Sequence, residues 1–377
     1  MTEKNKSIRN FPNLRFPGFA VEWEVNKLGD ICKMQAGKFV SASEILKETD
    51  NKLYPCYGAN GLRGFTYSYN YEGEYSLIGR QGALCGNVTR VFDKFYATEH
   101  AVVVTPKYKV HSTWLFYLLK YLNLNQYATG MAQPGLSVQN LLEVESIITD
   151  SLEEQEKIAF LLSLIDDRIS TQKKILKELK SLIKSSREKI FSQKLKFRTV
   201  NEIDFSNWEI KKIRDLFEIK KGEQLNKDDL NDAGSYPCLN GGISFSGFTE
   251  KFNSEENTIT ISEGGNSCGY INFMSTKFWL GGHCYKIIVN KNASKKYFYH
   301  LLKYNESKIM NLRVGSGLPN IQLKDLKNLN LLVSNDFEEQ TQIANFLSSI
   351  DEKIETEKKI LAQYETQKKY LLANLFI

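Results

Sequence analysis

Apolar residues recur at alternating spacings of four and three residues in two long stretches of the chain. The first stretch runs from Ile158 to Ile190, and the second runs from Ile343 to Leu375. Neither contains proline or glycine, and each follows an acidic segment, SLEEQ or DFEEQ, that suits the positive end of a helix dipole. This period predicts two long helices, each of which packs along another helix.

The two predicted helices most naturally pair with each other in an antiparallel arrangement, because the segment between them lets the chain return. The alternative is two unrelated amphipathic helices that pack on separate domains. Gln172 and Glu357 are equivalent polar positions in the two seams, and a polar seam residue costs stability but can fix the register. The residues expected to form the helix seam and to serve in partner docking are Ile158, Leu162, Ile165, Ile169, Gln172, Leu176, Ile343, Leu347, Ile350, Ile354, Glu357 and Leu361.

Residues 21–150 and 206–335 have a different pattern, in which short apolar runs are separated by turn residues. Strand-like runs include YSLIG and AVVVT in the first segment, and NTITIS and YKIIVN in the second. One helical stretch follows in each, HSTWLFYLLKYL or SKKYFYHLLKYN. The fold class that we predict is α+β, with two mixed α/β domains separated by a pair of long antiparallel coiled-coil helices.

The chain also contains an internal duplication with an offset of 185 residues. EEQEKIAFLLSLIDDRISTQKKIL at 153–176 matches EEQTQIANFLSSIDEKIETEKKIL at 338–361, and Trp23-Glu24 matches Trp208-Glu209. The helical parts stayed alike while the globular parts diverged, which favours one scaffold with two specificities over a duplication without functional meaning.

The duplication also divides the chain, which at 377 residues is too long for one ordinary domain. We expect an N-terminal segment and first globular domain at 1–150 and a helical spacer at 151–200. A second globular domain at 201–335 and a second helical spacer at 336–377 would follow.

Composition narrows the class of protein only slightly. There are 50 basic and 44 acidic residues, a net charge of +6 that permits nucleic-acid binding if the charge is clustered. No apolar run approaches the roughly 20 residues needed to cross a bilayer, and the N-terminus does not have the pattern of a signal peptide. Six scattered cysteines without a CxxC pair indicate a reduced, cytoplasmic chain.

The loops carry different polar residues in the two copies at positions where glycines are shared. GRQGALCGN at 79–87 stands where the second copy has SEGGNSCGY at 262–270. Arg, Gln and Asn pair bidentately with guanine or adenine edges, Ser and Glu also read bases, and Lys suits phosphates. Ordinary drift of surface loops is the alternative at each position. The candidates for contact with DNA are Arg63, Arg80, Gln81, Asn87, Arg90, Lys94, Asn240, Glu263, Asn266, Ser267 and Lys277.

Motifs of the enzymes that act on DNA are missing from the sequence. It contains neither an NPPF-like or DPPY-like methyltransferase motif nor a GxxxxGK[ST] phosphate-binding loop. Four scattered histidines do not form a metal-ligand pattern. Cys268 and His283 could form a thiol nucleophile, but both have counterparts in the first copy, Cys85 and His100, which favours a packing role. We therefore expect no catalytic or metal site.

Several motifs resemble those of the specificity subunits of type I restriction–modification systems. They are PNLRFPGF followed by EWE, KLGDI, the paired EEQxxIAxxLxxID helix starts, and the GMAQPGLS and GSGLPNIQ stretches that precede those helices. The resemblance extends over nearly the whole chain. One departure is that the second copy has GSGLPN where the first has MAQPGLS, so the two turns need not have the same role.

The resemblance implies that 21–150 and 206–335 are target-recognition domains, each reading one half of a split DNA sequence through the major groove. It implies that the helices are spacers that set the gap between the half-sites and dock two adenine methyltransferase subunits. Two motor–nuclease subunits would complete the restricting complex in phage defence. No cofactor is expected in this chain, whereas the partners would use S-adenosylmethionine, ATP and Mg. The alternative is a coiled-coil structural adaptor that does not contact DNA.

Overall fold

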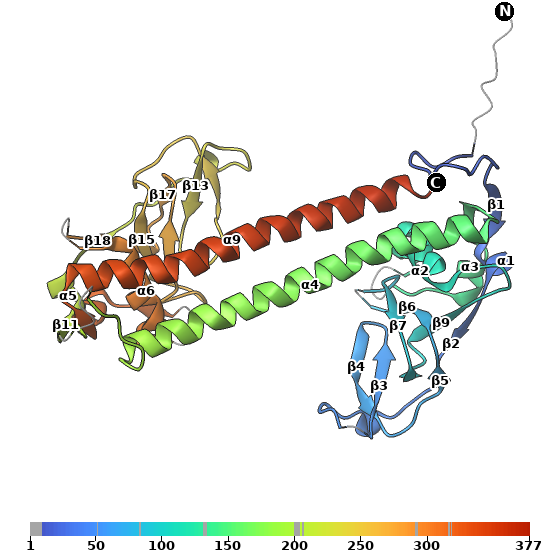
Figure 1. Ribbon diagram of the computed structural model, residues 1–377, viewed down its shortest axis with the longest axis horizontal. Helices are drawn as coiled ribbons and strands as arrows, with labels where there is room; N and C mark the ends of the chain where they lie inside the picture. The colour runs from blue at the N-terminus through green and yellow to red at the C-terminus, as the bar shows by residue number, and fades with distance from the viewer. Residues whose placement is uncertain are drawn as a thin grey trace, which may run out of the picture. The chain divides into compact units, whose positions relative to one another are not determined.

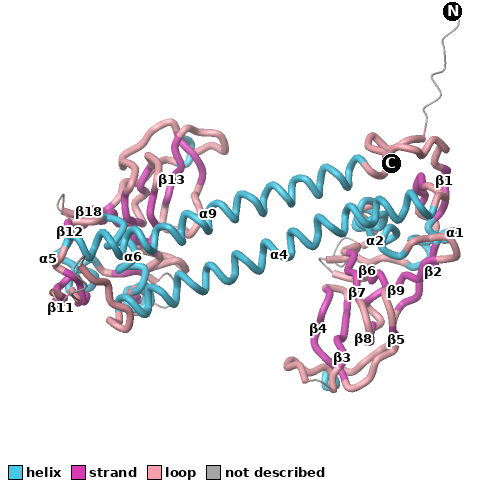
Figure 2. Tube along the Cα trace, viewed as in Figure 1, coloured by secondary structure: helices cyan, strands magenta, loops and turns pink. Residues whose placement is uncertain are grey.

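The computed structural model describes residues 10–50, 52–82, 84–130, 134–199, 204–205, 207–290, 293–315, 317 and 319–377 (Figures 1 and 2). Parts of the GMAQPGLS and GSGLPNIQ stretches, residues 131–133, 316 and 318, lie outside this description. The chain divides into two compact units. One contains 1–173 together with 360–377, and the other contains 174–359.

The two predicted long helices are present as α4 (Leu152–Phe191) and α9 (Phe337–Asn374), drawn green and red in Figure 1. Side-chain caps begin both. Ser151 Oγ accepts a hydrogen bond from Glu154 N at 3.3 Å, and Asp336 Oδ1 accepts one from Glu338 N at 2.8 Å. Each helix has one half in each unit, so each unit contains its own stretch of the helix pair.

The helix pair is antiparallel in both units. In the first unit Asp166 and Lys173 of α4 contact Lys368 and Glu365 of α9, so rising numbers in one helix meet falling numbers in the other. The predicted seam positions face inward, and only Glu357 and Leu361 are half-buried. Those fully buried are Ile158, Leu162, Ile165, Ile169, Gln172, Leu176, Ile343, Leu347, Ile350 and Ile354. The predicted fold class, α+β with paired long helices, is confirmed.

The first unit contains two four-stranded sheets and a two-stranded ribbon. Helix α2 (Ser112–Tyr121) packs on strands β6, β7 and β9. The first sheet has the order β2 (Cys32–Ala36), β9 (Ala101–Pro106), β6 (Tyr75–Gly79), β7 (Val88–Val91). The second has the order β4 (Gly61–Thr66), β3 (Tyr54–Gly58), β8 (Lys94–Ala97), β5 (Tyr71–Glu72). The ribbon pairs β1 (Glu24–Lys27) with β10 (Glu145–Ile148), and the short helices are α1 (Leu28–Ile31), η1 (Ala42–Glu44), η2 (Leu124–Tyr127) and α3 (Val138–Leu142).

The second unit repeats this topology. Helix α6 (Lys295–Tyr304) takes the place of α2. The first sheet has the order β12 (Phe217–Lys221), β18 (Cys284–Val289), β15 (Thr258–Ser262), β16 (Ile271–Met274). The second has the order β14 (Gly247–Thr249), β13 (Tyr236–Leu239), β17 (Trp279–Leu280). The ribbons are β11 (Trp208–Lys212) with β21 (Asn330–Ser334) and β19 (Arg313–Val314) with β20 (Asn320–Ile321). The short helices are α5 (Ile213–Leu216), η3 (Lys227–Asp229), α7 (Glu306–Met310) and α8 (Leu323–Asn328).

The end of the chain completes the core of the first unit. Leu375 and Phe376 are buried in the cluster that α2 forms with the start of α4. The Phe376 ring stacks on Tyr121 at 5.5 Å and lies 6.0 Å from Trp114. In the part of the chain that the structure describes, no helix is long and apolar enough to span a membrane.

Candidate nucleic-acid interface

The glycine-bearing loops of the first unit come together in one loop cluster, formed by residues 57–61, 79–82, 84–87, 98–101 and 134–136. Backbone hydrogen bonds join the loops. Arg80 N donates to His100 O at 2.9 Å and Leu136 N donates to Arg80 O at 2.9 Å. Thr98 N donates to Tyr57 O at 2.9 Å. Loops that are far apart in the sequence therefore share one backbone framework.

The second unit builds an equivalent loop cluster from residues 239–247, 262–270, 281–284 and 319–321. Glu263 N donates to His283 O at 2.8 Å, and Ile321 N donates to Glu263 O at 2.9 Å. Gly241 N lies 3.0 Å from Cys284 Sγ. The two copies thus keep the framework while the side chains on it differ.

Equivalent glycines make the close packing of these loops possible. A Cβ on Gly37 would lie 2.2 Å from Ala97 O, and a Cβ on Gly222 would lie 2.3 Å from Gly281 O. Because backbone carbonyls occupy both spaces, any larger residue would push the loops apart.

Four predicted residues of the first unit lie on its loop cluster or beside it. Arg63, Gln81 and Asn87 are exposed. Arg80 is half-buried, and its Nε donates to Leu136 O at 3.1 Å, which fixes the start of its side chain. The structure therefore brings Arg63, Arg80 and Gln81 together on the framework.

Arg90 and Lys94 lie away from that cluster and have partners within the unit. Arg90 Nε donates to Glu74 at 2.9 Å, and its NH2 donates to Thr113 Oγ1 at 2.7 Å, which ties β7 to the start of α2. Lys94 Nζ lies 4.8 Å from the centre of the Tyr69 ring, and its contacts with Tyr69 and Glu72 raise the pKa of the ammonium. The Arg90 guanidinium therefore has a structural role.

In the second unit, Glu263 is also engaged internally. Its side chain is only 9% exposed and accepts hydrogen bonds from Lys221 and Tyr285, each at 2.7 Å. Asn240 Oδ1 accepts from His283 N at 3.3 Å. The Glu263 carboxylate therefore lies beneath the surface of the loop cluster and stabilises the loops through these bonds.

Asn266, Ser267 and Lys277 complete the predicted set. Asn266 is exposed and Ser267 half-buried on the loop of 262–270. Lys277 lies away from the loop cluster, 4.4 Å from the Phe252 ring and 3.3 Å from Glu255. Lys94 in the first unit has the same arrangement, with its ammonium group over an aromatic ring and near a glutamate. The two lysines therefore have equivalent surroundings.

Comparison with known proteins identifies the repeated unit. The family model of the type I restriction modification DNA specificity domain matches residues 20–181 and, a second time, residues 205–366. The chain belongs to this family. Among its members, the EcoprrI specificity subunit of Escherichia coli is 46% identical over 154 residues, covering 41% of this chain and 38% of that protein. The MjaVIII specificity subunit of Methanocaldococcus jannaschii is 24% identical over 98% of this chain and 95% of that protein.

The crystal structure of a type I restriction–modification S subunit from M. genitalium has the same fold. It covers 97% of this chain and 99% of its own with a TM-score of 0.76, at 21% sequence identity. Three specificity subunits are 38–46% identical to this chain, but the matched regions cover only 38%, 39% and 40% of their length. The chain thus matches about two fifths of each of these relatives.

Several exposed polar residues on or beside the loop clusters of this specificity-family chain were not among the candidates. Lys38 follows Gly37 directly, and its backbone N donates to Ala97 O at 2.9 Å. His283 and Arg313 are exposed in the second unit, and β19, which carries Arg313, pairs with β20 beside Glu263. The position of Lys38 after a repeated glycine could have identified it from the sequence. Arg313 could not be identified in this way, because β19 reaches the loop cluster only through β20, whose Asn320 pairs with the distant Gly264.

The cysteines of this specificity-family chain pack in its interior, and all six are buried. Burial raises the pKa of the Cys32 thiol to about 12 and that of Cys284 to about 11, and it also raises the pKa of Cys268. Such thiols are protonated at neutral pH and are poor nucleophiles. Among the described residues, no group of three or more His, Cys, Asp or Glu side chains could hold a metal ion.

Proposed function

We propose that this chain is the DNA-recognition subunit of a type I restriction–modification complex and reads a bipartite target. The observation that carries the proposal is the loop cluster, which is built twice on one framework but presents different exposed polar side chains. In the first unit these include Arg63 and Gln81, and in the second Asn266 and Arg313. Two such surfaces suit two half-sites of different sequence.

The exposed side chains match the chemistry of base recognition. Arginine pairs bidentately with guanine, and asparagine or glutamine with adenine, and each such pair contributes about 1–3 kcal/mol of discrimination. Lys94 and Lys277 remain candidates for phosphate contact, because each keeps about two fifths of its side chain exposed. The proposal does not rest on Arg90 or Glu263, whose charges are engaged inside their units.

We further propose that two methyltransferase subunits dock on equivalent surfaces. Ten of the twelve seam residues are buried and Glu357 and Leu361 are half-buried, so a partner would also need side chains outside the seam. The ribbons β1–β10 and β11–β21 carry apolar cross-strand pairs at equivalent positions, Val25 opposite Ile147 and Ile210 opposite Leu332. Ile147 is half-buried against the core of the first unit, whereas the other three side chains are exposed. Val25 is 58% exposed and Ile210 is 72% exposed. Exposed apolar side chains at the repeated positions of Val25 and Ile210 suit two identical partners.

The remaining assignments follow from this role. The partners would supply adenine methylation with S-adenosylmethionine and the motor–nuclease functions with ATP and Mg, and this chain would hold no cofactor and catalyse no step. The cytoplasm is the proposed location, since six buried, unpaired thiols suit a reducing compartment.

Selection of binding sites from random DNA by the assembled methyltransferase complex tests the proposal. We expect two short conserved half-sites separated by a gap of fixed length. Gln81→Ala should relax one half-site and Asn266→Ala the other, each by about tenfold in affinity ratio. The matched control is Gln367→Ala on the outer face of α9, which should change neither. A complex that assembles but selects no sequence would instead support the adaptor role.

A further inference from the structure

A polar joint connects the first recognition unit to the helix pair. Tyr117 of α2 is 1% exposed, and its hydroxyl donates to Asp166 Oδ2 of α4 at 2.8 Å. Asp166 Oδ1 accepts a hydrogen bond from Lys368 Nζ of α9 at 2.5 Å. Ser163 Oγ lies 3.4 Å from the same hydroxyl. One carboxylate therefore links three helices.

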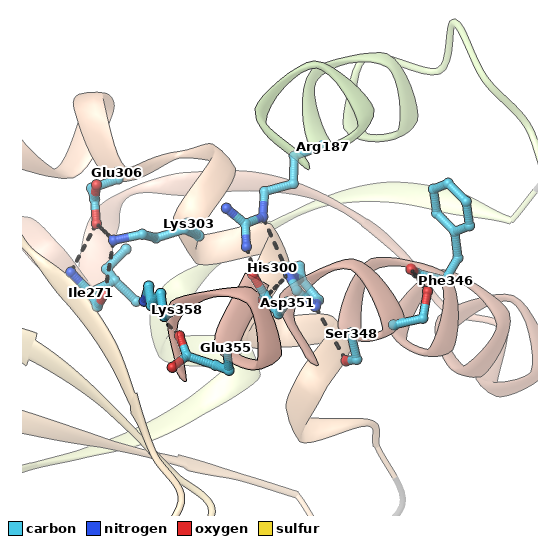
Figure 3. A network of polar contacts seen from close by, with 11 residues as sticks. Arg187, Ile271, His300, Lys303, Glu306, Phe346, Ser348, Asp351, Glu355 and Lys358 are labelled. Carbon is cyan, nitrogen blue, oxygen red and sulfur yellow. Dashed lines mark hydrogen bonds and ion pairs between the residues drawn. The ribbon is translucent and has the colours of Figure 1, made fainter. Parts of the chain in front are cut away.

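The second unit has a related joint, in which three residues, His300, Ser348 and Asp351, occupy the positions equivalent to Tyr117, Ser163 and Asp166, while the cation comes from the other long helix (Figure 3). His300 of α6 replaces Tyr117, Asp351 of α9 replaces Asp166, and Arg187 of α4 supplies the cation. Arg187 donates to Asp351 Oδ2 and to His300 Nδ1, each at 3.2 Å, and His300 Nε2 lies 3.4 Å from Ser348 Oγ. Since arginine cannot accept, His300 Nδ1 must be the acceptor, and the neutral ring donates through Nε2 to Ser348.

Further polar contacts lead from each joint to the sheet that carries the reading loops. In the second unit, Lys303 Nζ donates to Ile271 O of β16 at 3.0 Å, and β16 pairs with β15, which runs directly into Glu263. In the first unit the contact of Arg90 with Thr113 joins α2 to β7, which pairs with β6. Polar contacts and strand pairing thus connect each joint to the sheet that carries the reading loops.

We infer that Asp166 and Asp351 are positioning residues, which fix the orientation of each recognition domain on the helix pair and thereby set the permitted gap between half-sites. The inference rests on the proposed function. Both carboxylates are partly shielded, with side chains 34% and 35% exposed, and both belong to the ID pair of the repeated helix motif. A helix pair that only held the domains apart would need no such charge at both equivalent positions.

The test compares Asp166→Asn with Asp167→Asn, which removes an exposed carboxylate from the next position of the same helix. The assembled methyltransferase complex is given DNA whose half-sites are separated by the native gap or by one base pair more or less. For Asp166→Asn we expect the preference for the native gap to fall about tenfold while base preferences within the half-sites stay unchanged. Asp167→Asn should behave as the unmodified chain.

A distance measurement without DNA tests the role of the joint independently of the proposed function. Because the native cysteines are buried, spin labels can be placed on Leu62→Cys of β4 and Ser170→Cys of α4, both exposed positions of the first unit. The distance distribution between the labels should broaden or shift in Asp166→Asn and not in Asp167→Asn. If Asp166→Asn does not fold, Tyr117→Phe removes one hydrogen bond of the same joint. An unchanged distribution and gap preference would overturn the inference, whereas an unmodified complex that recognises no DNA would overturn the proposed function alone.

Discussion

Protonation of His300 should destabilise the second unit as the pH falls. The ring is 1% exposed, and burial, followed by the charges of Arg187 and Lys296, lowers its pKa to about 2. In the unfolded chain the pKa returns to about 6.5. Because the folded state binds the proton less readily, the stabilisation is present above pH 6.5 and is lost as the pH falls below it.

The size of this effect follows from the unfolded-state pKa, provided that the folded-state pKa stays below about 5. Between pH 7.5 and 5.5 the free energy of unfolding should fall by about 1.4 kcal/mol through this residue. The charged groups that act on the ring are Arg187 from α4 and Lys296 from α6, and Asp351 of α9 lies 3.9 Å from it. Glu355, Lys358 and Lys303 in turn act on Asp351. Burial raises the pKa of Asp351, so the comparison stays at pH 5.5 and above.

Hydrogen exchange resolved by peptide measures the two units separately. In the unmodified chain, protection of α6 should decrease between pH 7.5 and 5.5 relative to that of α2, after correction for the intrinsic exchange rate. His300→Tyr, which copies the residue of the first unit, should remove about 1.4 kcal/mol of that pH dependence. The control is His283→Gln, which removes an exposed histidine from the same unit. Equal pH dependence in His300→Tyr and the unmodified chain would show that His300 does not lower the stability of the second unit as the pH falls.

Three further substitutions test other parts of the structure. Phe376→Ala should lower the free energy of unfolding of the first unit by about 3–5 kcal/mol in urea denaturation, because it empties a buried aromatic site; a loss below about 1 kcal/mol would contradict this. Gly37→Ala should weaken recognition of the first half-site alone in binding-site selection, because its Cβ would lie 2.2 Å from Ala97 O. The control Gly135→Ala should have no effect, since its Cβ would be 3.8 Å from the nearest atom. Equal effects of the two substitutions would argue against the importance of the close contact between Gly37 and Ala97. Arg90→Ala should lower the thermal midpoint of the first unit and leave the bases selected unchanged, whereas altered bases without lost stability would restore Arg90 as a reader.

Periodicity was sufficient to predict the helix pair, because burial along a long helix depends on local spacing. The seam from Ile158 to Leu176 is buried at the predicted positions. The contribution of Phe376 to the first core could not be predicted in this way. Its partner Trp114 is more than 250 residues earlier in the sequence, and no local pattern joins them.

Residue type alone was a poor guide to which loop side chains face solvent. Arg90 and Glu263 have the chemistry of base readers, but Glu74 and Lys221 engage them within the fold. Tyr117 and His300 had the pattern of ordinary core positions in an apolar helix. Their shared role becomes visible only when the sheet-covering helix is placed on Asp166 or Asp351.

Mapping of methylated adenines by single-molecule sequencing decides whether this one chain reads two different half-sites. The DNA would come from cells that express this chain with its methyltransferase partner. We expect a single bipartite motif with a fixed gap, in which Gln81→Ala relaxes one half and Asn266→Ala relaxes only the other. Methylation at an uninterrupted motif, or a change in both halves from either substitution, would contradict it.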